Sequence, residues 1–450
     1  MSVIFSKFVV MGATVLDELY VLFRKHKKVS TDTRELVSGS IFFALKGDKF
    51  NGNKFAEKAL EKGAAYAVVD DRKVVKGDKY ILVPNVLKAL KQIAVRYRME
   101  MLIPVIGITG TNGKTTTKEL ITAVLSKRYR VHATSGNLNN HIGVPLTLLS
   151  MPDDTEIAVI EMGASRPSEI SELCKICIPT YGLITNISNA HLEGFGTFEK
   201  IIDTKGELYR AVERVHGKLF VNKDNPLLRE LSGDPSNCFF YGTTPPVYAQ
   251  VISIGEHSVH LHAKLFGTST SPNAKDLITS LVGSYNLENV AAACCIGRYF
   301  GLTDQQIKEG IESYKPENMR SQIIHTQKNT VILDAYNANP TSMYLAVDNF
   351  AKMYCSGDKY IVLGDMLEMG ENSLDDHKKI VKQLQENSDF RGVFLAGDNF
   401  VKASKGTPFK SFKDVAKLST HIRQNTFLGA FFLVKGSRGL KMEKVLEAIN

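Results

Sequence analysis

The sequence lacks any stretch that is long and apolar enough to cross a membrane. A short apolar patch near its start is broken by Asp17 and Glu18, so we expect no secretory signal peptide. Runs of like charge are also missing, because the net charge of +9 over 450 residues comes from lysine and arginine interspersed with acids. This pattern is typical of a solvated mixed surface and argues against a nucleic-acid partner, although a basic balance suits anionic substrates such as nucleotides. Internal repeats and low-complexity tracts are absent, which excludes repeat architectures.

Cysteine is sparse. Six cysteines are scattered at positions 174, 177, 238, 294, 295 and 355. A chain of this length does not need disulfides, so we expect a reducing, cytoplasmic location. Cys174 and Cys177 form a C-x-x-C pair, but no second cysteine or histidine pair stands at metal-binding spacing. We therefore predict that both pack in the core rather than form a metal or redox site.

The most informative segment is V-I-G-I-T-G-T-N-G-K-T-T-T-K at residues 105–118, which reads as a buried strand, a glycine turn and a helix start. The glycines allow backbone amides to face phosphate oxygens, and the helix N-terminus adds positive potential. Lys114 supplies a charge at the β- and γ-phosphates, and Thr115 a hydroxyl for magnesium. The generic phosphate-loop pattern has a glycine where Ile108 stands, so a plain glycine turn is the alternative. The candidate nucleotide-binding residues are Gly110, Thr111, Asn112, Gly113, Lys114, Thr115 and Thr116.

The residues after this loop support a nucleotide site. Apolar side chains recur with helical spacing and fall on one face, at Leu120, Ile121, Val124 and Leu125. A helix of this kind packs against a sheet, which favours a nucleoside-triphosphate site over a plain turn.

The chain is too long for one hydrophobic core, so we expect two or three domains. Short strands alternate with helical stretches, a pattern typical of parallel sheets covered by helices. Strands are expected at 40–45, 66–69, 80–83, 157–160, 181–186, 219–222, 331–333, 360–363, 393–395 and 431–434. We predict an α/β protein of three domains: a small α/β domain at 1–84, a central phosphate-loop NTPase-like parallel sheet at 85–316, and a Rossmann-like domain at 317–450.

Polar residues at strand ends are candidates for holding magnesium beside the phosphates. Glu161 follows the strand at 157–160, so its carboxylate would emerge at the carboxyl edge of the sheet. His191 follows the next strand, and a plain surface or core histidine is an equally good interpretation from the residues alone. Lys205 reads as an ordinary exposed helix lysine.

Several segments together resemble the Mur ligase family of peptidoglycan synthesis. They are T-G-T-N-G-K-T-T at 109–116, E-M-G at 161–163, N-I-S-N-A-H-L-E-G-F-G at 186–196 and L-D-A-Y-N-A-N-P at 333–340. The resemblance extends from D-T-R at 32–34 to V-K-G-S-R-G at 434–439. It implies an ATP-dependent, ADP-forming amide ligase with a UDP-substrate domain, an ATP domain and a domain that brings the amine.

Within the family, the residues resemble the branch that joins D-alanyl-D-alanine to UDP-N-acetylmuramoyl-tripeptide. The pattern lies in Y-N-A-N-P at 336–340, G-D-M-L-E-M-G at 364–370 and A-H-L at 190–192. It implies an acyl-phosphate intermediate and UDP-N-acetylmuramoyl-pentapeptide as product, made by a cytoplasmic, monomeric enzyme. Ser188 and Tyr285 depart from the residues common in the family, which leaves details of substrate binding open. A neighbouring amide ligase, such as a folylpolyglutamate synthase, and a nucleotide-binding regulatory protein are the alternatives.

The resemblance also assigns roles to individual residues. The catalytic residues are Lys114, His191 and Lys205. Magnesium, as two ions, is held by Thr115, Glu161, His191 and Lys205, the last matching a lysine that many family members carry as a carbamate. ATP is further contacted by Asn286, Asn289, Arg320 and Asp334. For the two asparagines, capping of the following helix is the alternative.

Substrate-binding residues follow from the same resemblance. The UDP-muramoyl substrate is expected at Asn139 and Asn140, with an asparagine-rich turn as the alternative. The uridine nucleotide is expected at Thr33, Arg34, Asn51 and Gly52. On the side of the incoming dipeptide the residues are Tyr336, Asn337, Asn339 and His377.

Overall fold

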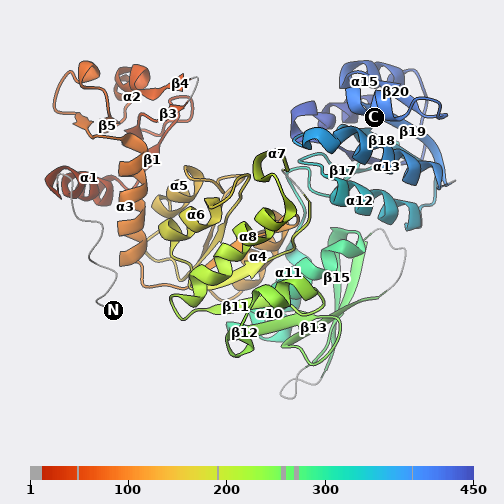
Figure 1. The fold of residues 1–450 in the computed structure, drawn as a ribbon, viewed down its shortest axis with the longest axis horizontal. Coiled ribbons are helices and arrows are strands. Elements are labelled where there is room, and N and C mark those ends of the chain that lie inside the picture. The colour runs from red at the N-terminus through yellow and green to blue at the C-terminus, as the bar shows by residue number, and fades with distance from the viewer. Residues whose placement is uncertain (1–12, 48–49, 190–191, 255–259, 268–272, 388) are drawn as a thin grey trace. The chain divides into compact units, whose positions relative to one another are not determined.

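The computed structural model describes residues 13–47, 50–189, 192–254, 260–267, 273–387 and 389–450 (Figure 1). The chain forms two compact units. Unit 1 comprises Met1–Gly107, His132–Met162 and Ser171–Thr180, and unit 2 comprises Ile108–Val131, Gly163–Ile170 and Tyr181–Asn450. Among the described helices, none has both the length and the apolar character needed to span a bilayer. The expected three-domain boundaries stay a prediction.

Unit 1 begins with helix α1 (Ala13–His26) and a small parallel sheet of strand order β1-β2-β5-β6. Its strands are β1 (Val29–Ser30), β2 (Ile41–Phe43), β5 (Tyr66–Val69) and β6 (Tyr80–Leu82). Helix α2 (Ala56–Glu61) packs its alanines against Phe42, Ala67 and Val69 in one hydrophobic cluster. The small α/β unit is therefore confirmed, although the strand expected at 40–45 is shorter.

The remainder of unit 1 contains helix α3 (Val86–Glu100), helix α5 (Gly143–Leu149) and strand β9 (Ile157–Glu161). It also includes the first three residues of β7 (Val105–Thr109) and the last two of β8 (Val131–Ala133), and the strand order is β7-β9-β8. The C-x-x-C pair belongs to this core. Cys174 and Cys177 are buried, with their sulfur atoms 3.9 and 3.7 Å from Met162 Sδ. Burial raises the pKa of the Cys177 thiol to about 12. All six cysteines lie within the described residues and form no disulfide, so the expected core packing is confirmed.

Unit 2 contains a sheet region of strand order β15-β14-β13-β12-β11-β10. Strands β10 (Tyr181–Ile184), β11 (Lys218–Asn222), β12 (Cys238–Gly242) and β13 (Ala249–Ile254) pair in parallel. The expected strands at 181–186 and 219–222 correspond to β10 and β11, whereas β12 and β13 were not predicted. Strands β14 (His260–Leu265) and β15 (Lys275–Val282) are antiparallel additions that the sequence did not predict. Burial alternates along β14, so polar residues face solvent at every second position and weaken the apolar signal.

Helix α4 (Lys114–Leu125) follows the phosphate loop and is tightly enclosed. Its predicted apolar face is fully buried, at Leu120, Ile121, Val124 and Leu125. Helices α10 (Leu287–Tyr299) and α11 (Asp304–Ser313) both pack against it. A Cβ atom on Gly310 of α11 would lie 2.6 Å from Val124 Cα, so the two helix backbones approach as closely as glycine allows.

The C-terminal part of unit 2 is a second α/β sheet of strand order β16-β17-β21-β18-β19-β20. Strand β16 (Gln322–His325) is antiparallel to β17 (Thr330–Asp334), whereas β21 (Phe431–Lys435), β18 (Lys359–Gly364), β19 (Phe390–Ala396) and β20 (Lys410–Phe412) are parallel to it. This confirms the expected Rossmann-like sheet.

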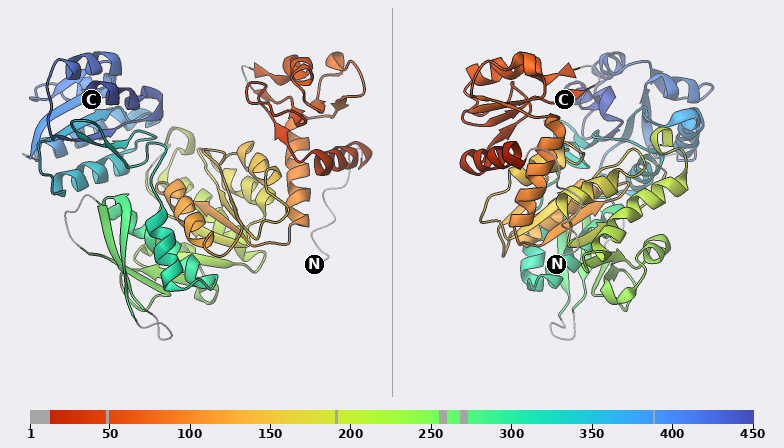
Figure 2. Two further views of the ribbon diagram at one scale, coloured as in Figure 1. Left: turned by 180° about the vertical axis from the view of Figure 1, so that it is seen from behind. Right: turned by 60° about the vertical axis from the view of Figure 1, so that its left-hand side comes forward.

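Helices cover both faces of this C-terminal sheet, which is coloured blue in Figure 2. Helices α12 (Pro340–Lys352), α13 (Ser373–Gln385) and α14 (Asp398–Ala403) contribute to one hydrophobic cluster. Helices α15 (Val415–Arg423) and α16 (Leu446–Ile449) contribute to the cluster on the other face. The helix after β21 therefore lies on the opposite face from those after its neighbours β17 and β18. Such a switch point is where open α/β sheets bind ligands, at the carboxyl ends of the strands.

Candidate functional site

The phosphate loop leaves β7 and turns through two glycines with positive φ, +147° at Gly110 and +79° at Gly113. Residues after β10 hold it from the side. Asn186 accepts hydrogen bonds from the Thr111 amide to its carbonyl oxygen at 2.8 Å and from the Asn112 amide to its side chain at 3.0 Å. Thr185 Oγ1 donates to the Asn112 carbonyl at 2.6 Å. The loop is thus pre-formed at the start of α4, with Thr115 and Thr116 in the first turn.

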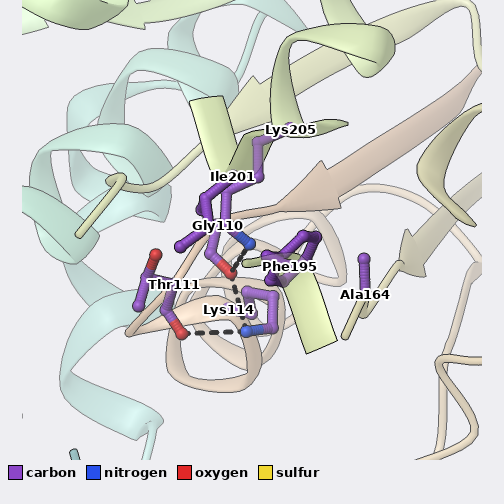
Figure 3. Close-up of a pocket in the computed structure, with 7 residues that line it drawn as sticks. All are labelled: Gly110, Thr111, Lys114, Ala164, Phe195, Ile201 and Lys205. Carbon is purple, nitrogen blue, oxygen red and sulfur yellow. Dashed lines mark hydrogen bonds between the residues drawn. The ribbon is translucent and has the colours of Figure 1, made fainter. Parts of the chain in front are cut away.

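Two lysines meet at this loop. Lys114 Nζ donates to the carbonyl oxygens of Gly110 at 2.8 Å and Thr111 at 3.0 Å. Lys205 Nζ, from helix α8 (Phe198–Glu213), donates to the same Gly110 oxygen at 3.0 Å (Figure 3). The pocket around them is lined by Gly110, Thr111, Lys114, Ala164, Phe195, Ile201 and Lys205.

Lys205 is buried, with 4% of the residue exposed. The interpretation of Lys205 as an exposed helix lysine is therefore wrong. Burial, reinforced by the nearby charge of Lys114, holds the pKa of Lys205 well below its ordinary value. Its amine is consequently biased toward the neutral, nucleophilic form.

Glu161 ends strand β9 and is almost completely buried. Its Oε1 accepts a hydrogen bond from Asn139 Nδ2 at 2.8 Å, and its backbone amide donates to Thr134 Oγ1 at 2.9 Å. Asn140 instead receives the amides of Ile142 and Gly143 on its side-chain oxygen, the turn role given above as the alternative. The structure thus brings one of the two predicted substrate asparagines against a predicted metal ligand.

The side chains of Glu161 and Thr115 fit Mg²⁺, because a carboxylate and a hydroxyl are both hard oxygen donors. Glu161 is fixed by its amide partner, and Thr115 is buried in the first turn of α4. His191 lies outside the described residues. Within the described part of the chain, no group of three His, Cys, Asp or Glu side chains is placed to hold a metal.

Asn286 and Asn289, at the start of α10, are both buried. Asn286 makes no side-chain capping bond. Its side-chain Nδ2 instead donates to the Val282 carbonyl at 2.7 Å, so the capping alternative is wrong for Asn286. Asn289 donates to Asn286 Oδ1 at 2.8 Å and accepts from Thr117 Oγ1 of α4 at 2.9 Å. A Cβ on Gly113 would lie 2.7 Å from Asn289 Oδ1. The pair therefore touches the phosphate loop and joins α10 to α4.

Asp334 stands at the carboxyl end of β17 in an ion pair with Lys435 at the end of β21. Their Oδ2 and Nζ atoms are 2.5 Å apart, and Lys435 is 2% exposed. Sequence reasoning missed Lys435, although a lysine that ends an apolar strand next to a strand ending in aspartate was an available signal. The guanidinium of Arg320 lies 3.7 Å from the centre of the Tyr336 ring, two residues after Asp334 in the chain.

Three other residues predicted to bind substrate have internal roles. Asn337 accepts the Ala338 amide at 2.9 Å. Asn339 caps α12 by accepting the Ser342 amide at 2.8 Å, and its Nδ2 donates to Asn112 Oδ1 at 2.7 Å. His377 is fully buried: its Nε2 accepts the Met366 amide at 3.0 Å, so its Nδ1–H donates to the Ser373 carbonyl at 2.6 Å. Burial lowers the pKa of His377, which keeps the ring neutral.

The candidate uridine residues also make local contacts. Arg34 pairs with Asp32 at 2.5 Å, and these hydrogen bonds lower the pKa of Asp32 to about 2. The Thr33 carbonyl accepts Lys62 Nζ at 2.8 Å. Asn51 accepts the Asn53 amide at 3.1 Å, and a Cβ on Gly52 would lie 2.4 Å from the Leu45 carbonyl oxygen. These residues shape the loops after β1 and before α2.

The fold and the loop define a nucleotide-binding α/β protein of the phosphate-loop class. Three family models match the chain: Mur ligase family, catalytic domain, at residues 25–108; Mur ligase middle domain at 108–297; and Mur ligase, glutamate ligase domain, at 319–438. The chain belongs to the Mur ligase family.

Named relatives agree across nearly the whole chain. The UDP-N-acetylmuramoyl-tripeptide–D-alanyl-D-alanine ligase of Bacillus subtilis is 36% identical over 430 residues, which cover 93% of this chain and 92% of that protein. The crystal structure of MurF from Acinetobacter baumannii matches with a TM-score of 0.83 and 28% identity, covering 94% of this chain and 93% of that one. MurF from Thermotoga maritima in complex with ADP matches with a TM-score of 0.82 and 28% identity, covering 95% and 97%.

Proposed function

We propose that this protein is a MurF-type ligase. It joins D-alanyl-D-alanine to the terminal carboxylate of UDP-N-acetylmuramoyl-tripeptide with consumption of ATP, in the cytoplasm and as a single chain. The observation that carries this proposal is the near full-length match to relatives that bear this ligase name. The pre-formed phosphate loop with its two lysines supports it, because the reaction needs a place for the ATP phosphates.

The chemistry requires activation of a carboxylate, which is a poor electrophile. Transfer of the γ-phosphoryl group to the tripeptide carboxylate makes an acyl phosphate, and the dipeptide amine then attacks with release of phosphate. Lys114 stabilises the charge that develops on the phosphoryl oxygens once it exchanges its two loop carbonyls for phosphate. Exclusion of water from the acyl phosphate is required to limit its hydrolysis.

We assign the magnesium ions to the residues that the family resemblance names, which are Thr115, Glu161, Lys205 and His191. When bound, Mg²⁺ neutralises charge on the phosphates. Asn139 orients the Glu161 carboxylate for this role through its hydrogen bond of 2.8 Å.

We propose that Lys205 is carbamylated, which its burial and the nearby charge of Lys114 support. A neutral amine attacks carbon dioxide, forming an N–C bond and releasing one proton, which leaves a carbamate anion. This converts the repulsion between Lys114 and a charged Lys205 into attraction. The lowered pKa of Lys205 thus supports the proposed modification.

The function is tested by measuring phosphate release from MgATP by the purified protein, with UDP-N-acetylmuramoyl-tripeptide present and D-alanyl-D-alanine added or withheld. We expect release only with both substrates, together with a pentapeptide product identified by mass. Release that is indifferent to the dipeptide, or that needs another amino acid or a folate acceptor, would reject the proposed function.

Asn139→Ala should weaken magnesium binding. Loss of the amide that orients Glu161 is expected to raise the Mg²⁺ concentration for half-maximal activity about tenfold. Asn137→Ala, at an exposed position on the same segment, is the matched control. If Asn139→Ala instead raises only the KM for the UDP substrate, Asn139 binds substrate and the metal-orienting role is wrong.

A further inference from the structure

The carboxyl edge of the C-terminal sheet carries an exposed basic side chain, Arg438, to which no role has yet been assigned. The loops after β17, β21 and β18 meet at this edge, where the covering helices change face. At this edge Lys435 forms an ion pair with Asp334. Arg438, three residues after Lys435, is exposed and has no carboxylate within 4.0 Å among the described residues.

Arg438 is nevertheless held in place. Its guanidinium lies 6.0 Å from the centre of the Tyr336 ring, and its Nη1 lies 3.3 Å from Met319 Sδ. Arg320 occupies the same ring at 3.7 Å. Two guanidinium groups therefore lie near the ring of Tyr336. The role of Tyr336 in binding substrate stays a prediction.

The other predicted dipeptide residues use several of their polar atoms within the fold. Asn337 and Asn339 use their side-chain oxygens to accept backbone amides, and both ring nitrogens of His377 are engaged within the fold. The incoming dipeptide carries a carboxylate that the reaction leaves unchanged, and a carboxylate drawn out of water needs a cationic partner. Arginine matches it with two parallel hydrogen bonds.

We propose that Arg438 binds the free carboxylate of the incoming D-alanyl-D-alanine, with Tyr336 and Met319 as positioning residues for its guanidinium. The inference rests on the proposed function and names the residue that selects the acceptor. Leu367, 43% exposed, lies over Gly439 at the same edge and offers an apolar surface to the alanine methyl groups.

The test compares D-alanyl-D-alanine with its C-terminal amide as acceptors for the full-length enzyme. In the unmodified protein, the amide should have a KM roughly 10- to 100-fold higher than the free acid. Arg438→Met should raise the KM for the free acid by a similar factor and abolish the preference for it over the amide. The KM for ATP should not change. Arg438→Lys, which keeps the charge without the planar fork, should recover part of the preference.

Arg391→Met, at an exposed arginine of the same domain, is the matched control and should leave all parameters unchanged. A preference for the free acid that persists in Arg438→Met, or a rise in the KM for ATP alone, overturns the assignment of Arg438 while the ligase function stands. Absence of turnover with D-alanyl-D-alanine in the unmodified protein overturns both.

Discussion

Lys114→Met should lower kcat for ligation about a thousandfold, because it removes a cation from the phosphates during phosphoryl transfer. The methionine keeps most of the volume of the lysine but cannot offset the charge that develops on the γ-phosphoryl oxygens. The fold should persist, since the hydrogen bonds from Lys114 Nζ to Gly110 and Thr111 stay within its own loop.

The measurement is steady-state phosphate release with both substrates present, paired with a circular dichroism spectrum. Lys127→Met is the matched control, because Lys127 is exposed just beyond the same helix. Turnover within a few-fold of the unmodified enzyme would show that the loop does not carry the reaction.

Lys205→Met should also reduce ligation about a thousandfold, because it removes the site of the carbamate and hence a ligand for magnesium. Unlike the loop variant, it should make the protein more stable. In carbon-dioxide-free buffer Lys205 carries no carbamate, and the burial of its amine costs free energy despite the hydrogen bond to the Gly110 carbonyl. An apolar chain of similar length fits the same space. We expect the apparent Tm to rise by about 2–4 °C.

This stabilisation has a defined pH dependence. The folded-state pKa of Lys205 is lowered, so between that pKa and the ordinary value the unfolded chain binds the additional proton. The stability of the unmodified protein therefore rises with pH through this window, and the advantage of Lys205→Met should shrink toward alkaline pH. Thermal unfolding in carbon-dioxide-free buffer measures it, with Lys200→Met on the exposed side of α8 as control. A stabilisation that is equal at all pH values would contradict a lowered pKa.

Much of this architecture could be predicted from local sequence. Strand β5 has the expected bounds, and the apolar face of α4 is buried as its spacing indicates. The sequence did not predict strands β14 and β15. One face of each strand is less buried, so apolar residues alternate with polar ones and form no continuous apolar run. Local sequence could not predict where a side chain lies in the tertiary structure. The segment around Lys205 reads as polar and exposed, yet its helix turns the amine into the phosphate loop.

The same limit applies to the roles of asparagine and histidine. Asn139 and Asn140 are adjacent in sequence, but one orients Glu161 and the other caps a turn. His377 fits a substrate-binding pattern and is instead enclosed. Which polar atoms remain available to a ligand depends on the partners that folding supplies, and those partners lie far away in the sequence.

The close approach of α11 to α4 should also slow the exchange of amide protons in α4 with solvent. Gly310 lies against the Val124 backbone and α10 packs against the same helix, so we expect these contacts to oppose local shifts and unwinding of α4. Amide protons in its middle turns should therefore exchange with solvent only on the scale of global opening, both with and without nucleotide. Exchange that slows on nucleotide binding should be confined to the loop before the helix. Helix α4 would then stay rigid throughout the catalytic cycle, and only the phosphate loop before it would change its conformational mobility when nucleotide binds or leaves.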